Sequence, residues 1–168
     1  ENRGDGCVRT AIYPAYKANR EPAPQELKRQ FSLCREVVRA FGLAEFGSSR
    51  YEADDIIGTL TVLGQQSGQP VTIVSRDKDL TQLLTECDVY WDAIADVRYR
   101  HGDVAERFGA RPERMADFLA LMGDAVDNIP GVPGVGRKTA ATLLKHFGTL
   151  EGVGWVAALT DGTDKVPI

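Results

Sequence analysis

Seven carboxylate residues are gathered in three short stretches, each near a point where a helix or turn should begin: Glu52, Asp54 and Asp55; Asp77 and Asp79; Asp124 and Asp127. Carboxylates held close together repel one another unless a cation lies between them. Mg²⁺ is a hard ion that prefers oxygen ligands, and two such ions can activate a water and stabilise the leaving oxygen in phosphodiester hydrolysis. The set therefore predicts a site for two Mg²⁺ or Mn²⁺ ions.

Each cluster also has a purely structural interpretation. Acidic residues are favoured in the first turn of a helix, Glu52 could close a capping box with Ser49, and Asp77 could cap the helix after it. This interpretation is adequate for any one cluster. It does not explain why three occur together, so the metal site is the stronger prediction for the set.

A glycine-rich stretch precedes the start of a basic helix. Residues without side chains there would let backbone N–H groups approach a phosphate at the helix N-terminus. The residues of this predicted DNA contact are Gly131, Gly134, Gly136, Arg137, Lys138 and Thr139. A tight turn between two packed helices is the alternative. Nucleotide-binding loops are disfavoured, because the P-loop requires lysine where Arg137 stands and the dinucleotide pattern requires a small residue where Thr139 stands.

An aromatic and basic pattern lies near the beginning of the chain. Tyr13, Tyr16, Lys17 and Arg20 are spaced to share one face of a continuous helix. Such a face could stack a nucleobase and hold a backbone phosphate. A solvated amphipathic surface is the alternative.

Apolar periodicity predicts strands alternating with helices in the first part of the chain. We expect helices over residues 12–20, 27–41, 49–66 and 79–85, and strands over 43–47, 71–75 and 88–91. This alternation favours an α/β fold with a mainly parallel, helix-covered sheet. The stripe of Leu27, Phe31, Cys34, Val38 and Phe41 should pack in the core. From residue 102 the pattern is all-helical, with helices near 103–108, 112–122 and 137–147 and a frayed end over 161–168.

Composition narrows the class of protein. With 168 residues, of which 43% are hydrophobic, the chain can bury one sizeable core without disulfides. Three separated cysteines and two isolated histidines argue against a zinc site or a catalytic triad, and the thiols should be reduced and mostly buried. No apolar run is long enough to span a bilayer, which favours a soluble, cytoplasmic protein. The net charge of −4 includes the seven clustered acids and therefore does not exclude a nucleic-acid partner.

Four motifs in this order resemble the 5′ nuclease family, which includes the 5′-to-3′ exonuclease domain of bacterial DNA polymerase I, free-standing relatives and the flap endonucleases. They are YKANR, YEADDIIGTL, VTIVSRDKDL and FLALMGDAVDNIPGVPGVGRKTA. The resemblance implies a PIN/resolvase-like core over residues 1–101, followed by a helix-three-turn-helix region over 102–168 that packs with it as one unit. It also implies cleavage of DNA at a 5′ flap, branch or free 5′ end, by a monomer that is fused to or cooperates with a polymerase.

The resemblance assigns roles to individual residues. The seven acids would line the metal site, Lys17 and Arg20 would act on the scissile phosphate, and Tyr16 would lie near the terminal bases. The glycine stretch would grip duplex DNA, with K⁺ as a possible additional ion. Two departures stand out. The two strands with which the family usually begins are expected to be missing, with Glu1 and Asn2 near the position of a family aspartate that would bind metal, and Arg76 replaces a usual glycine. They keep open an alternative, a catalytically inactive module that binds branched DNA.

Overall fold

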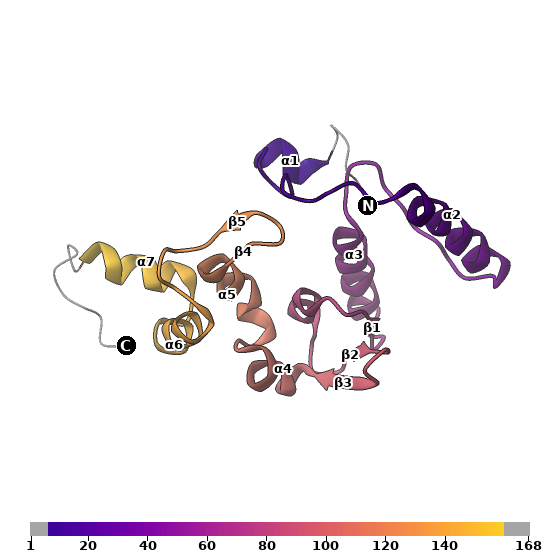
Figure 1. The fold of residues 1–168 in the computed structure, drawn as a ribbon. Coiled ribbons are helices and arrows are strands. Elements are labelled where there is room, and N and C mark those ends of the chain that lie inside the picture. The colour runs from indigo at the N-terminus through magenta and orange to yellow at the C-terminus, as the bar shows by residue number, and fades with distance from the viewer. Residues whose placement is uncertain (1–6, 160–168) are drawn as a thin grey trace. The chain divides into compact units, whose positions relative to one another are not determined.

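The computed structural model describes residues 7–159 of the chain, which form two compact units. Unit 1 contains the residues up to Ile57 together with Val126–Asn128. Unit 2 contains Gly58–Ala125 and the residues from Ile129 onward. Figure 1 labels the helices and strands of both units. Glu1, Asn2 and the predicted frayed end over 161–168 lie outside the described residues.

Unit 1 begins with a short helix, α1 (Val8–Ile12), that ends where the backbone of Tyr13 becomes extended. Residues 14–19 form turns, so the helix predicted over 12–20 is wrong. Pro14 accounts for the break, because proline lacks an N–H donor and disfavours helical backbone at the residue before it. The side chains of this segment are therefore arranged by the turns and not by a helical period.

The second helix of unit 1, α2 (Gln25–Ala40), is present, but its apolar stripe does not form a core. None of its residues is buried, and the side chains of Phe31 and Phe41 at this helix are 43% and 78% exposed. The core packing predicted for this stripe is therefore wrong for the described residues. An amphipathic period specifies a helix, but it does not supply a second surface to cover the apolar face.

Helix α3 (Ala53–Gln66) begins close to its predicted start, but without the predicted capping box. The hydroxyl of Ser48, and not that of Ser49, accepts hydrogen bonds from two backbone N–H groups of the preceding turn. Asp55 then accepts from the backbone N–H of Glu52 at 2.8 Å. The carboxylate of Glu52 interacts with other groups. Residues 43–47 have no regular secondary structure, so the strand predicted there is wrong.

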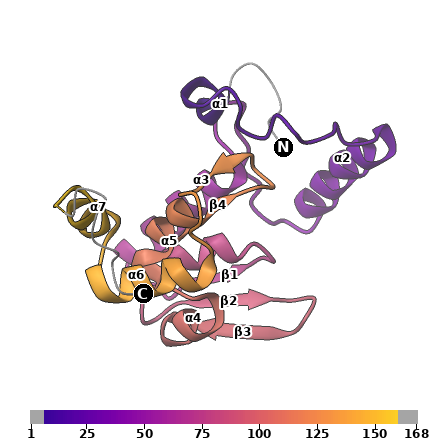
Figure 2. The same ribbon diagram turned by 60° about the vertical axis from the view of Figure 1, so that its left-hand side comes forward.

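Unit 2 contains a three-stranded sheet. Its strands, in spatial order, are β1 (Thr72–Val74), β2 (Val89–Asp92) and β3 (Val97–Arg100), which are labelled next to one another in Figure 2. Strands β1 and β2 are parallel, as predicted, whereas β3 forms an antiparallel hairpin with β2 that the sequence analysis missed. The connection between β1 and β2 contains the helix predicted near 79–85, which is the 3₁₀-helix η1 (Lys78–Leu83). The α/β fold class is confirmed, with a mixed sheet.

Helices dominate the rest of unit 2, as predicted. They are α4 (His101–Phe108), η2 (Pro112–Arg114), α5 (Met115–Met122), α6 (Arg137–Phe147) and α7 (Leu150–Leu159). Between α5 and α6 lies a small hairpin of β4 (Gly123–Asp124) and β5 (Ile129–Pro130). This hairpin and α7 were not anticipated. No helix of the described chain is long and apolar enough to cross a membrane.

The buried apolar side chains of unit 2 come mainly from the sheet, from η1 and its C-cap, and from the helices that follow the sheet. Phe118, Met115, Leu121 and Val104 are the largest hydrophobic side chains that are fully buried there. The prediction of mostly buried thiols is wrong, because Cys34 and Cys87 are exposed in their respective units while Cys7 is buried; all three cysteines are free.

A buried carboxylate joins three segments of unit 2. Asp88 is 0% exposed and accepts hydrogen bonds from Val71 N, Gln65 Nε2, and both N and Oγ1 of Thr85, at 2.7–2.8 Å. Burial alone would raise the pKa of Asp88, but these donors outweigh it and hold the pKa below its usual value. Asp88 thus contributes stability as an anion.

Replacing Asp88 by asparagine should destabilise unit 2 by about 1–3 kcal/mol at neutral pH, because the amide N–H₂ group would face a donor and leave it unpaired. Because the pKa of Asp88 is depressed in the folded state, its contribution is fully present above the ordinary value and is lost as pH falls through the depressed one. Urea denaturation at neutral and acid pH measures both effects. Asp96→Asn, at an exposed turn, is the control; equal losses for both variants would contradict the assignment.

Candidate active site

Unit 1 gathers three of the predicted side chains onto two carboxylates. The phenol of Tyr16 donates to Glu52 Oε2 at 2.9 Å, and Lys17 Nζ lies 2.9 Å and 3.0 Å from the two carboxylate oxygens of Glu52. Arg20 pairs with Asp127 through Nη2, and Lys17 Nζ lies 3.8 Å from the other oxygen of Asp127. Tyr13, the fourth member of the predicted stripe, is 38% exposed.

A second arginine in unit 1 belongs to this network and was missed by the sequence analysis. Arg9 donates to both carboxylate oxygens of Asp55, at 2.5 Å and 2.8 Å, and its Nη1 lies 3.7 Å from Glu52 Oε2. This two-pronged geometry matches guanidinium to carboxylate. Arg9 lies in α1, and its partner Asp55 is 46 positions away, so no local pattern ties the two together.

The charges of this network stabilise one another. Burial alone would raise the pKa of Glu52, but hydrogen bonds from Lys17 and Tyr16 hold it below its usual value. The pKa of Asp55 is lowered chiefly by Arg9. Burial and the hydrogen bond to Glu52 raise the pKa of Tyr16, which keeps its phenol protonated as a donor. The site is therefore an array of fixed anions and cations at neutral pH.

Two backbone conformations that are uncommon for residues other than glycine occur side by side at this site. Lys17 and Asn128 have φ angles of 54° and 58°. The Lys17 N–H donates to the Asp127 carbonyl at 2.8 Å, and Asn128 Nδ2 donates to the Ala15 carbonyl at 2.7 Å. These bonds fasten residues 15–17 to residues 127–128 within unit 1. Asn128 was also absent from the sequence prediction.

The remaining predicted metal ligands are distributed as follows. Asp54 lies exposed in the first turn of α3, in unit 1, whereas Asp77, Asp79 and Asp124 belong to unit 2. Asp77 caps η1 by accepting from Asp79 N at 3.0 Å, which confirms its structural role. Lys78 Nζ lies 2.9 Å from Asp79 Oδ1. Burial lowers the pKa of Lys78, but Asp79, Asp77 and Asp124 together raise it above its usual value.

The donor chemistry of these acids suits a hard divalent cation, because all of them offer carboxylate oxygen. Within the described residues, however, no three acids or other ligand side chains converge closely enough to hold a metal ion. In unit 1 the cations next to the carboxylates are the chain's own, Lys17, Arg9 and Arg20. Arg76, which replaces a usual glycine, is exposed and lies 3.9 Å from Asp92.

The glycine stretch of unit 2 brings two backbone segments into direct contact. A Cβ atom on Gly131 would lie 2.2 Å from the carbonyl carbon of Met122, and one on Gly123 would lie 2.3 Å from Gly131 N. Gly134 has a φ of +79°, which glycine adopts at low cost. Gly136 is the N-cap of α6 and offers no side chain. The N-terminus of α6 therefore presents backbone N–H groups.

The basic side chains of this stretch lie on the surface of unit 2. Arg137 and Lys138 are exposed, and Thr139 is half-buried. Arg137 Nη2 donates to the Arg107 carbonyl at 2.7 Å, so it is tied to α4. The tight turn that was considered as an alternative is present, and it leaves the helix N-terminus uncovered by a capping side chain.

Gly131→Ala should destabilise unit 2 by about 1–3 kcal/mol. The new Cβ would overlap backbone atoms, which cannot rotate aside as the end of a side chain could. Chemical denaturation provides the measurement. Gly102→Ala is a matched control within helix α4: its Cβ would meet nothing within 4 Å, and alanine is the better helix former. It should leave stability unchanged or raise it, and a similar loss in both variants would contradict the close approach.

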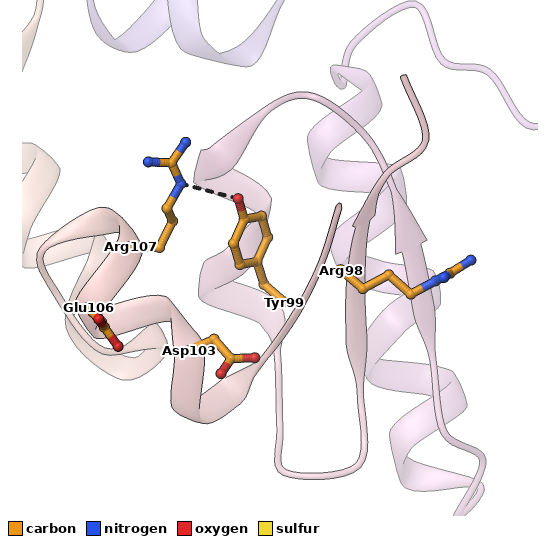
Figure 3. Close-up of a pocket in the computed structure, with 5 residues that line it drawn as sticks. All are labelled: Arg98, Tyr99, Asp103, Glu106 and Arg107. Atoms are coloured by element: carbon orange, nitrogen blue, oxygen red, sulfur yellow. Dashed lines mark hydrogen bonds between the residues drawn. The ribbon is translucent and has the colours of Figure 1, made fainter. Parts of the chain in front are cut away.

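A pocket of about 540 Å³ in unit 2 is a weaker candidate for a site. It is lined by Arg98, Tyr99, Asp103, Glu106 and Arg107. Figure 3 shows Arg107 meeting the hydroxyl of Tyr99, a hydrogen bond of 3.1 Å, while Arg98 points away on the other side of β3. These charged groups do not converge on a common point, so the pocket lacks the arrangement expected of a binding site.

Comparisons with known proteins identify the family. Residues 2–109 match the family described as 5′-3′ exonuclease, N-terminal resolvase-like domain, and residues 110–165 match 5′-3′ exonuclease, C-terminal SAM fold. DNA polymerase I of Rhizobium leguminosarum is 48% identical over 143 residues, which cover 85% of this chain and 14% of that protein. A 5′-3′ exonuclease of Aquifex aeolicus is 40% identical over 145 residues, covering 86% of this chain and 50% of that protein.

Solved structures agree with this identification. The T5 D15 protein, co-crystallised with metal ions, superposes with a TM-score of 0.78 at 26% identity, covering 88% of this chain and 60% of that one. The chain thus spans half or less of these two sequence relatives and about three fifths of the T5 protein. Both matched regions and the fold confirm the resemblance drawn from the four motifs: the chain belongs to the 5′-3′ exonuclease family, with a resolvase-like domain followed by a SAM fold.

Proposed function

We propose that this chain is the nuclease part of a structure-specific 5′ nuclease that hydrolyses DNA phosphodiesters at a 5′ flap, branch or free 5′ end. The observation that carries the proposal is the convergence of Tyr16, Lys17 and Arg20 on Glu52 and Asp127 within unit 1. These residues come from three separate motifs of the family. A T5 D15 flap endonuclease of similar fold has been crystallised with DNA and metal ions.

In this proposal Lys17 and Arg20 bind the scissile phosphate, and Tyr16 lies near the terminal bases. The positive charges of Lys17 and Arg20 are paired with carboxylates in the structure. When a phosphate binds, each cation would therefore replace a carboxylate partner by a phosphate. Duplex DNA is held at the N-terminus of α6, where backbone N–H groups favour an anion and Arg137 and Lys138 add charge. K⁺ at the glycine stretch is a further part of the proposal.

Two divalent ions, Mg²⁺ or Mn²⁺, would be held by carboxylates drawn from the seven acids, among them Asp54, Asp77, Asp79 and Asp124. When bound, such ions lower the pKa of a water and neutralise charge on the phosphate. The protein's own contribution is to orient the phosphate through Lys17 and Arg20, to keep Glu52 ionised and to hold Asp127 in place.

The rest of the assignment follows from this function. We propose a division into a nuclease core over residues 1–101 and a DNA-binding region over 102–168. We also propose a monomer that is joined to or works with a DNA polymerase, as the relatives named DNA polymerase I suggest. A cytoplasmic location stays a prediction.

The test is cleavage of a flapped duplex labelled at its 5′ end, incubated with the chain and Mg²⁺, Mn²⁺ or a chelator. We expect short labelled products with either metal and none with chelator. Binding of the duplex without cleavage under all three conditions would favour the inactive DNA-binding module. Cleavage that persists in chelator would contradict the metal-dependent mechanism.

A further inference from the structure

We propose that Asn128 is a positioning residue of the nuclease site: its side-chain amide holds the loop that carries Tyr16 and Lys17 against the loop that carries Asp127. The inference rests on the proposed function and deepens it. The side-chain amide of Asn128 donates to the carbonyl of Ala15, which directly precedes Tyr16 and Lys17 in the chain. Its effect must therefore pass through the loop that follows Ala15.

Asn128 combines two properties that few residue types share. Its backbone is left-handed, with a φ of 58°, which asparagine tolerates better than most residues. Its amide also reaches a carbonyl 113 positions away in the sequence at 2.7 Å. Glycine would satisfy the first property but not the second, and aspartate would satisfy the first while presenting the wrong hydrogen-bonding group.

Loss of the Asn128 hydrogen bond should affect Lys17 most. Its own φ of 54° is uncommon for lysine, so the surrounding contacts must maintain it. One of these contacts is its N–H bond to the Asp127 carbonyl, and the Asn128 amide forms the neighbouring bond in the opposite direction. Without the amide, the only backbone hydrogen bond between Lys17 and residues 127–128 would be the one to the Asp127 carbonyl, beside its ion pairs and the local bond from Arg20 N–H to the Lys17 carbonyl.

The geometry of Lys17 sets the scale of the effect. Its Nζ lies 2.9 Å and 3.0 Å from the Glu52 oxygens and 3.8 Å from Asp127. Displacements of about 1 Å in such groups can reduce a reaction rate by as much as about a hundred-fold. We expect loss of one neutral hydrogen bond to have a smaller effect, about ten-fold.

The first experiment compares single-turnover cleavage of the flapped duplex by Asn128→Gly and Asn128→Asp. Glycine preserves the backbone and deletes the amide, so the rate should fall about ten-fold. Aspartate turns carboxylate oxygens toward the Ala15 carbonyl and should cost more than glycine. A wild-type rate for Asn128→Gly would overturn the proposal, because it would show that only the backbone conformation matters. Asp96→Gly replaces another left-handed residue, in unit 2, and should not change the rate.

A double-mutant cycle shows whether the effect passes through Lys17. In the Lys17→Met background, Asn128→Gly should cause little further loss, because the group that it positions is already gone. A full ten-fold loss in that background would overturn the positioning role, since independent effects multiply.

Hydrogen exchange provides a readout that does not depend on cleavage. The Lys17 amide should exchange about ten-fold faster in Asn128→Gly, while amides of β1 and β2 in unit 2 keep their protection. Unchanged exchange at Lys17 would overturn the proposal. If the wild-type chain does not cleave DNA but Lys17 exchange still accelerates, the proposed function fails while the positioning of Lys17 by Asn128 is supported.

Discussion

Replacing Asp77 and Asp79 together by asparagine should reduce flap cleavage by about a thousand-fold while preserving DNA binding. If these two carboxylates hold the metal ions as proposed, their loss removes metal-ion catalysis, which contributes several kcal/mol of transition-state stabilisation, and each 1.4 kcal/mol is a factor of ten. The fold should persist, because asparagine caps a helix as well as aspartate and can still accept from the N–H of residue 79.

The expected binding behaviour separates this outcome from unfolding. Removal of two negative charges should leave affinity for duplex DNA unchanged or slightly raise it at low salt. Asp92→Asn with Asp96→Asn removes two charges from the β2–β3 hairpin of the same unit and serves as the matched control. Cleavage by the Asp77/Asp79 variant within ten-fold of wild type would sink the assignment of these residues to a metal site.

The second large effect is expected for Lys17→Met, with a loss of at least about a hundred-fold in single-turnover cleavage. Methionine keeps most of the length of the side chain but leaves Glu52 without the ammonium group that lies 2.9 Å away. Removal of one preorganised group that stabilises developing charge typically costs about 10²–10³ in rate. Arg39→Met, which removes the Arg39–Glu45 ion pair elsewhere in unit 1, is the control.

The pH dependence of this variant has a defined sign. Lys17 is one of the groups that lower the pKa of Glu52, so the pKa of Glu52 should rise in Lys17→Met. If ionised Glu52 is required, the acidic limb of the pH–rate profile should move to higher pH. A lower rate with an unshifted acidic limb would show that Lys17 acts on the phosphate without affecting Glu52.

The sequence predicted elements well where local periodicity and side-chain chemistry agree. Helix α6 was expected over 137–147 and has those bounds, because its apolar spacing starts after Gly136 and ends before Gly148. The strands β1 and β2 were found for a similar reason, as β-branched and aromatic runs bounded by turn residues. The four motifs together identified the family, which none of them would have done alone.

The parts that were missed depend on contacts between distant segments. Tyr16, Lys17 and Arg20 were selected for a shared helix face that does not exist, yet they converge because turns after Pro14 bring them to Glu52 and Asp127. Arg9 and Asn128 carry no local pattern, since their partners are 46 and 113 positions away. Periodicity also could not show that the apolar stripe of α2 would be left exposed.

The scarcity of buried apolar groups in unit 1 has a consequence for ionic strength. Among its described residues only Cys7 and Tyr16 are buried hydrophobic side chains, so the active-site segments are held together largely by ion pairs. These pairs are partly buried, with Arg9 and Lys17 2.5 Å and 2.9 Å from their carboxylate partners, well inside the Debye length of about 8 Å at physiological ionic strength. Salt should therefore screen them only weakly and act mainly by displacing the protein from DNA phosphates. Cleavage and DNA binding should then decline in parallel as salt is raised.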